Sequence, residues 1–99
     1  SIVSKTDIDG IITYVNDEFC KVSGYSRDEI IGKTHSILKS NDKSKEFYES
    51  FWKTIKEDKK SWQGVFKNRA KDGSIYYLKT TVKPILDENN EIIEFIALM

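Results

Sequence analysis

Residues 61–85, SWQGVFKNRAKDGSIYYLKTTVKPI, predict two long strands joined by a tight turn at Asp72 and Gly73. Glycine adopts the positive φ that such turns require, and aspartate tolerates it. Side chains alternate between the two faces of a strand, so every second residue lies on the same face. We expect the core-facing side of the first strand to hold Trp62, Gly64, Phe66, Asn68 and Ala70. Because a buried amide needs hydrogen-bond partners, Asn68 is a candidate for contact with a bound ring that has polar edges.

The composition indicates one domain of modest size. The chain has 99 residues, of which 38% are hydrophobic, and its 16 basic side chains balance 16 acidic ones. No basic run is long enough to suggest a nucleic-acid or membrane surface, and no apolar run is long enough to span a bilayer. With Cys20 alone, neither a disulfide framework nor a cysteine metal site is expected.

The ends of the sequence bear on whether the domain is part of a longer protein and on its location. Both SIVSKT and EFIALM resemble strands, and no signal peptide precedes the first of them. We therefore expect residues 1–99 to be a single domain excised from a longer protein, with a cytoplasmic location and no direct membrane contact.

The order of elements predicts an α+β fold. Two short strands, Ile2–Thr6 and Ile11–Val15, precede the helices, and Ile92–Leu98 follows the hairpin as a last strand. Asn16 is a predicted N-cap, and Ser26 with Glu29 forms a predicted capping box. His35–Leu38 fits one further helical turn. The resulting strand-strand-helices-strand-strand-strand order implies an antiparallel sheet with helices packed on one face.

One longer amphipathic helix is expected from Asp42 or Ser44 to about Asp58. Its apolar residues recur at spacings of three and four, which gives one wide stripe. The stripe contains Phe47, Tyr48, Phe51, Trp52 and Ile55. We expect its aromatic residues to be core, with one member lining a pocket.

Two local sequences together resemble the PAS family of sensor domains. Residues 16–32, NDEFCKVSGYSRDEIIG, are similar to the first helices of that family, and SWQGVFKNRAKDG with the following tyrosines and KPI is similar to its second half. The resemblance covers essentially all 99 residues. It implies a five-stranded antiparallel sheet curved around a pocket, with short helices as the opposite wall.

Within this family the chain most resembles the redox and aerotaxis sensors that hold FAD. Those sensors have a Trp-x-Gly followed four residues later by Asn-Arg, matched here from Trp62 to Arg69, and a polar residue where His35 stands. The resemblance implies that Asn68 offers a donor and an acceptor to the polar edge of an isoalloxazine. Trp62 would supply a flat apolar surface, and His35 would donate to the flavin. The predicted cofactor-binding residues are Asn68, Trp62, His35, Phe66, Leu78 and Ile37.

The sequence departs from the flavin-binding light sensors of the same superfamily. Those sensors have a reactive cysteine in the pocket helix, where this chain reads His35-Ser36-Ile37-Leu38, so a photochemical adduct is not expected. Leu78 replaces their second asparagine and Met99 replaces a glutamine on the last strand. Cys20 is expected to be a small buried hydrophobe.

Three functions remain open at this point. The first is a flavin-based redox or oxygen sensor that signals to an output domain in the same chain, with a homodimer formed through flanking segments. The second is a sensor of another small ligand, either a metabolite or, less favoured, haem, for which only His35 could ligate iron. The third is a ligand-free dimerisation and relay module, whose core would be packed shut around Asn68. No catalytic pair, metal cluster or phosphate loop indicates an enzyme.

Overall fold

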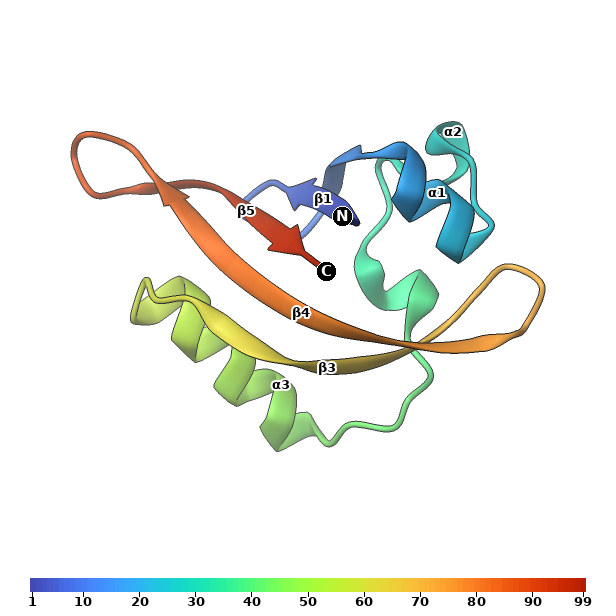
Figure 1. Ribbon diagram of the computed structural model, residues 1–99. Coiled ribbons are helices and arrows are strands. Elements are labelled where there is room, and N and C mark those ends of the chain that lie inside the picture. Colours follow the sequence, from blue (N-terminus) through green and yellow to red (C-terminus); the bar gives the residue numbers. More distant parts are fainter.

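A computed structural model describes all residues, 1–99, as a five-stranded antiparallel sheet with helices on one side (Figure 1). The expected order of elements is confirmed. The strands are β1 Val3–Thr6, β2 Ile12–Val15, β3 Trp62–Arg69, β4 Ile75–Leu86 and β5 Ile92–Leu98. The helices are α1 Asp17–Ser23, α2 Arg27–Ile30, the 3₁₀ turn η1 His35–Leu38, α3 Lys45–Trp52 and the π-helical turn η2 Lys53–Glu57.

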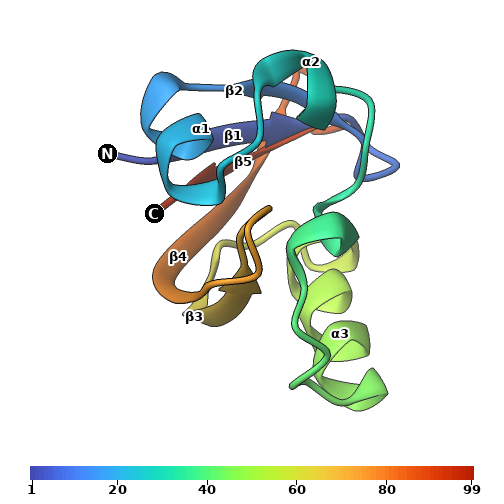
Figure 2. The ribbon, with the colours of Figure 1, turned by 90° about the vertical axis from the view of Figure 1, so that its right-hand side faces the viewer.

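The strand order β2-β1-β5-β4-β3 brings the two ends of the chain together in the middle of the sheet. Ile2 and Met99 exchange backbone hydrogen bonds of 3.2 and 2.9 Å. Figure 2 shows α1 and α2 beside β1 and β2 at one end, and α3 beside β3 at the other. The helices therefore form two groups, and η1 lies in the connection between them.

The short helices begin at the residues that the sequence predicts. The Asn16 side chain accepts a hydrogen bond from the Phe19 amide at 3.1 Å, and α1 ends at Gly24, which has a φ of 78°. Ser26 and Glu29 form the complete reciprocal capping box. These caps satisfy amides that have no partner inside helices of only one or two turns.

The hairpin has the predicted strands but a longer connection between them. The last paired residues are Arg69 and Ile75, so the loop comprises residues 70–74. The Ala70 amide donates to the Ser74 carbonyl at 2.8 Å, while the Asp72 carboxylate accepts from the Ser74 amide at 2.9 Å. Gly73 has a φ of 89°, which confirms its role in the turn, although Asp72 and Gly73 alone do not form it.

The long helix differs from the expected regular α-helix in its last turn. The Ser44 side chain caps α3 by accepting from the Phe47 amide at 3.0 Å, and after Trp52 the helix continues as the π-helical η2. The Asp58 amide donates to the Lys53 carbonyl, five residues earlier, at 2.9 Å. This wider turn ends the amphipathic stripe at Ile55, which is 1% exposed.

Two hydrophobic clusters stabilise the fold. The first joins β2, α1, α2 and η1 through Ile12, Val15, Phe19, Ile30 and Leu38. The second joins the α3–η2 helix to the sheet through Phe51, Ile55, Val82 and Phe95. Cys20 is a free, partly buried cysteine packed against the first cluster. None of the helices has the length and apolar character needed to cross a bilayer.

Candidate functional site

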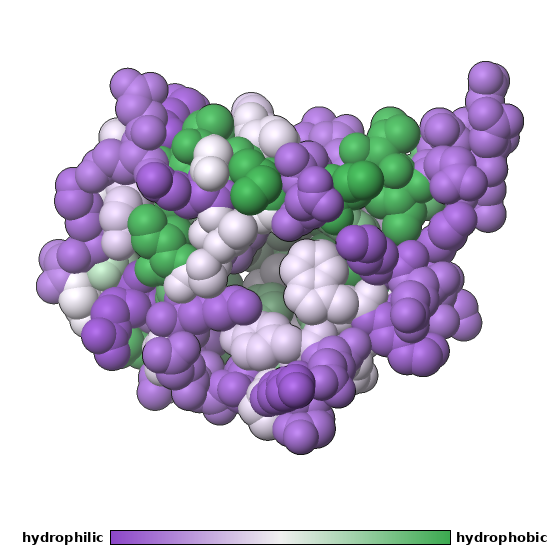
Figure 3. All heavy atoms as spheres, turned by 180° about the vertical axis from the view of Figure 1, so that it is seen from behind, coloured by the Kyte–Doolittle hydropathy of each residue, from purple (hydrophilic) through white to green (hydrophobic).

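A cavity of about 170 Å³ lies between the sheet and the helices. Its walls include Leu38 of the first hydrophobic cluster and all four members of the second, so it separates the two helix groups. Figure 3 shows a hollow near the middle of the rear face of the molecule, ringed by side chains of intermediate and hydrophilic character. The cavity is thus bounded by both halves of the chain and open to solvent on one side.

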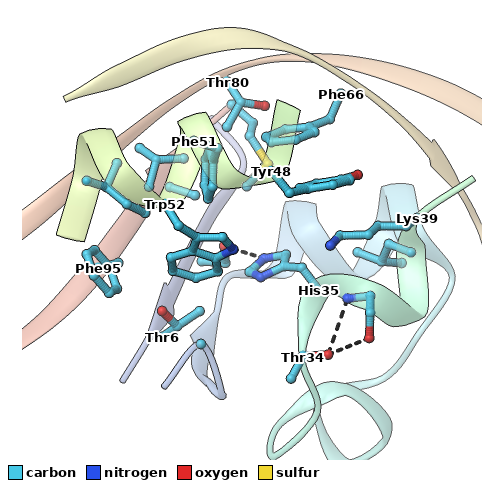
Figure 4. Close-up of a pocket in the computed structure, with 18 of the residues that line it drawn as sticks. Thr6, Thr34, His35, Lys39, Tyr48, Phe51, Trp52, Phe66, Thr80 and Phe95 are labelled. Carbon is cyan, nitrogen blue, oxygen red and sulfur yellow. Dashed lines mark hydrogen bonds between the residues drawn. The ribbon is translucent and has the colours of Figure 1, made fainter. Parts of the chain in front are cut away.

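The α3 helix supplies much of the aromatic wall. Tyr48, Phe51 and Trp52 all line the cavity, rather than the single member that the stripe predicted. Phe66 of β3 and Phe95 of β5 complete this wall (Figure 4). Phe51 meets Phe66 edge to face at 5.8 Å between ring centroids, and Trp52 meets Phe95 at 5.9 Å. Such rings favour a flat apolar ligand.

His35 borders the cavity from the first turn of η1. The Thr34 side chain caps that turn, which fixes the backbone at His35. Its Nε2 atom shares a hydrogen bond with Ser4 Oγ at 3.1 Å (Figure 4), and its ring meets Phe19 edge to face at 6.1 Å. Burial, and secondly the positive charge of Lys39, lower the pKa of His35 from 6.5 to about 4. The imidazole is therefore neutral near pH 7.

Asn68 reaches the same cavity from β3. Its side chain is partly buried, and it stands directly opposite Tyr76 across the β3–β4 ladder. Burial raises the pKa of Tyr76, and the Asn68 amide acts against that rise. The amide thus lies beside Tyr76, and it also lines the cavity, where a ligand can reach it.

Lys39 is a third polar residue of the wall, and the sequence prediction did not include it. Its Nζ lies 3.8 Å from the centroid of the Tyr48 ring. Burial lowers the pKa of this ammonium group. Figure 4 shows its side chain extending between Tyr48 and His35 into the cavity. An antiparallel backbone bridge pairs Lys39 with Asn68, and no local motif could have revealed a pairing across so many residues.

The structure brings together three of the six predicted cofactor-binding residues. His35, Phe66 and Asn68 line the cavity, whereas Trp62, Leu78 and Ile37 are absent from its wall. Ile37 lies on the outer side of η1 and is 37% exposed. Leu78 pairs with Phe66 in the ladder, but Thr80, one step further along the same face of β4, reaches the cavity instead.

Trp62 is absent from the cavity wall because its ring lies over Gly64, on the same face of β3. A Cβ placed on Gly64 would lie 2.4 Å from Trp62 Cη2, so the indole occupies the space above that glycine. There it packs against Phe51 and Phe66, with centroid distances of 5.0 Å to each. Trp62 therefore supports the aromatic wall from behind.

The whole chain matches the family model described as the PAS fold, over residues 1–99. It is 30% identical over 96 residues to a nitrogen fixation regulatory protein of Klebsiella pneumoniae, covering 97% of this chain and 19% of that protein. It is 34% identical over 88 residues to the aerotaxis receptor of Escherichia coli, covering 89% of this chain and 17% of the receptor. The chain therefore spans less than a fifth of the length of either relative.

Solved structures agree with this fold. A PAS domain from Colwellia psychrerythraea superposes with a TM-score of 0.85 at 22% identity, covering 97% of this chain and 80% of that one. The light-state LOV domain of the photoreceptor Aureochrome1 gives 0.87 at 20% identity, covering 98% and 77%. Together with the match over the full sequence, these findings show that the chain belongs to the PAS family, the sensory domains of signalling proteins.

Proposed function

We propose that this PAS domain binds FAD in the cavity between sheet and helices and senses redox state or oxygen for a larger signalling protein. The observation that supports this most directly is the position of Asn68 and His35 on the same cavity wall as a set of aromatic rings. The aerotaxis receptor, at 34% identity, points to the same class of signal. The output domain would lie in the same polypeptide, and the homodimer would form through segments that flank residues 1–99.

The donor set fits the polar edge of a flavin. Asn68 offers an N–H donor and a carbonyl acceptor, and neutral His35 offers one further N–H or lone pair, depending on its tautomer. Ser4, which bonds His35 Nε2, is fully buried at 0% exposure, so it holds the imidazole in a fixed orientation. A bound flavin would supply reversible electron uptake. These residues would orient the ring, and their hydrogen bonds to it would change when its redox state changes.

The cavity is too small to hold a whole flavin ring without movement of its walls. Pockets for drug-sized ligands are about 300–1,000 Å³, and this cavity is about 170 Å³. It therefore holds part of an isoalloxazine, and complete entry requires the helical wall to move outward. Trp52 is the residue best placed to move, because it is 38% exposed and stands at the end of α3, where the helix changes to the π-helical turn.

Absorbance of the purified protein tests the flavin proposal. We expect yellow protein, or yellow protein after refolding with FAD, and we expect Asn68→Ala to weaken FAD retention or to shift the flavin potential. Asn89→Ala is the matched control, because Asn89 is an exposed amide in the β4–β5 turn, away from the cavity. Protein that stays colourless after refolding with FAD would reject the flavin. Equal FAD retention and an equal flavin potential in both variants would remove Asn68 from the site.

The cavity volume also favours a second candidate, a smaller ring-shaped metabolite. An engineered apolar cavity of about 150 Å³ is known to bind benzene, so about 170 Å³ accommodates one aromatic ring without movement of the walls. Haem is not favoured, since the only histidine, His35, is hydrogen-bonded to Ser4. The ligand-free relay is the least supported, because the core beside Asn68 is hollow rather than packed shut.

A further inference from the structure

The ammonium group of Lys39 extends into the cavity without a charged partner. Lys39 belongs to none of the ion pairs of the chain, and its close neighbour is the Tyr48 ring, 3.8 Å from Nζ to the centroid. Asp9 is the only carboxylate residue in the cavity wall, and it is an exposed residue. A partly buried ammonium group that packs against one aromatic ring and has no anion beside it can be stabilised by an anionic ligand.

Backbone contacts hold the main chain of Lys39 beside that of Asn68. The bridge between Lys39 and Asn68 ties the segment after η1 to β3. The next residue, Ser40, strengthens the tie by donating from its hydroxyl to the Lys67 carbonyl at 3.0 Å. Lys39 and Asn68 therefore line the cavity from two paired segments, and His35 lines it from η1, directly before Lys39.

These groups together favour negative charge in the ligand. Asp9, His35, Lys39 and Tyr48 are the titratable residues of the wall. His35 is neutral, and burial raises the pKa of Tyr48, so its phenol is uncharged near neutral pH. The inner wall thus presents one positive charge and two further sources of N–H donors, beside aromatic, aliphatic and hydroxyl side chains.

We propose that Lys39 is a ligand-binding residue, and that this cavity selects planar aromatic ligands bearing an anionic oxygen, which Lys39 and Asn68 bind together. The inference rests on the proposed function only in placing a ligand in this cavity, and it specifies in addition that this ligand is negatively charged. Both a small ring with a carboxylate and the anionic form of a larger ring meet this description. Benzoate is the simplest probe, because it is one ring with one carboxylate and the cavity has a volume of about 170 Å³.

The proposal is tested by calorimetric titration, which measures the affinity for benzoate and for benzamide. Benzamide has a similar shape and no charge. We expect the wild-type domain to bind benzoate about tenfold more tightly than benzamide, the size of one charge-assisted hydrogen bond. Lys39→Met should abolish that preference and Lys39→Arg should keep part of it. The control is Lys45→Met, since Lys45 lies on α3 outside the cavity wall and its ammonium group is exposed beside Glu49.

The imidazole of His35 gives an independent readout, because Lys39 contributes to its low pKa. A bound carboxylate should raise the pKa of His35 measured by NMR titration in the wild type, and benzamide should not. A structural role of Lys39 alone would not produce that difference. Equal affinity for the two probes, an unchanged preference in Lys39→Met, or no binding of either probe would each overturn the proposal.

A separate reconstitution with FAD keeps this proposal distinct from the flavin proposal. If FAD binds to the wild type and to Lys39→Met alike, while benzoate shows no preference over benzamide, the charge selection is rejected and the flavin function stands. If benzoate is preferred through Lys39 but FAD does not bind, the flavin is rejected and the anion-selecting cavity stands.

Discussion

Acidification should destabilise this domain through His35 before its carboxyl groups titrate. The native pKa of about 4 lies below the ordinary 6.5, so the unfolded chain takes up a proton between these values while the native ring stays neutral. The free energy of unfolding therefore falls as the pH drops from 6.5 to 4, and this group adds no further loss below pH 4. For these two pKa values the loss between pH 7 and pH 5 is about 2 kcal/mol. Because the ring borders an open cavity, we expect about 1–2 kcal/mol.

Urea unfolding of the wild type and of His35→Gln at pH 7, 6 and 5 measures this loss. His35 is the only histidine, so the variant removes all imidazole titration while keeping a side chain that can bond Ser4. The difference between the two proteins isolates His35 from acidic groups such as Glu29, whose pKa is lowered mainly by its hydrogen bond to Lys71. NMR titration of the single imidazole gives the pKa directly. A midpoint near 6.5, or identical pH dependence in the two proteins, would refute the reasoning.

Two further substitutions test the packing that shapes the cavity. Gly64→Ala should destabilise the domain by about 1–3 kcal/mol in urea unfolding, because the new methyl would meet the indole of Trp62 at 2.4 Å; exposed Val65→Ala is the control, and a similar small effect of both would contradict the contact. Asn16→Ala should cost about 1–2 kcal/mol, since its side-chain oxygen accepts from the amides of Val3 at 3.0 Å and Phe19 at 3.1 Å. Asn16→Asp keeps that oxygen and should retain most of the stability; an equal loss in both variants would show that the cap is not the cause.

The features that the sequence predicted best are those made by residues close together in the chain. Asn16 caps α1 three residues away, and Ser26 and Glu29 close their box over the same distance. Alternation along β3 placed Asn68 correctly on the inner face because a strand has only two sides. Each of these contacts needs little more than the local backbone, so the residue types suffice to indicate it.

The features that the sequence did not predict depend on how separate segments meet. The hairpin loop is longer than two residues because Ser74 closes it back onto Ala70, and the π-helical turn after Trp52 breaks a regular periodicity. The α3 helix places three aromatic residues on the cavity instead of one, because Tyr48, Phe51 and Trp52 stand at spacings of three and four and share one helix face.

The candidate site shows the same division between local and distant contacts. His35, Phe66 and Asn68 were identified from residue type and resemblance, and all three line the cavity. Trp62 lies on the same face of β3 as Asn68, but its ring lies over Gly64 instead of in the cavity. The face on which a strand residue lies therefore does not decide whether its side chain reaches the cavity. Lys39 joins the site from the end of η1, which a backbone bridge pairs with Asn68. The charge of the cavity therefore comes from a pairing between distant segments.

A substitution that removes the hydrogen bond from the Ser40 hydroxyl to the Lys67 carbonyl should weaken selection for an anion, even though neither residue lines the cavity.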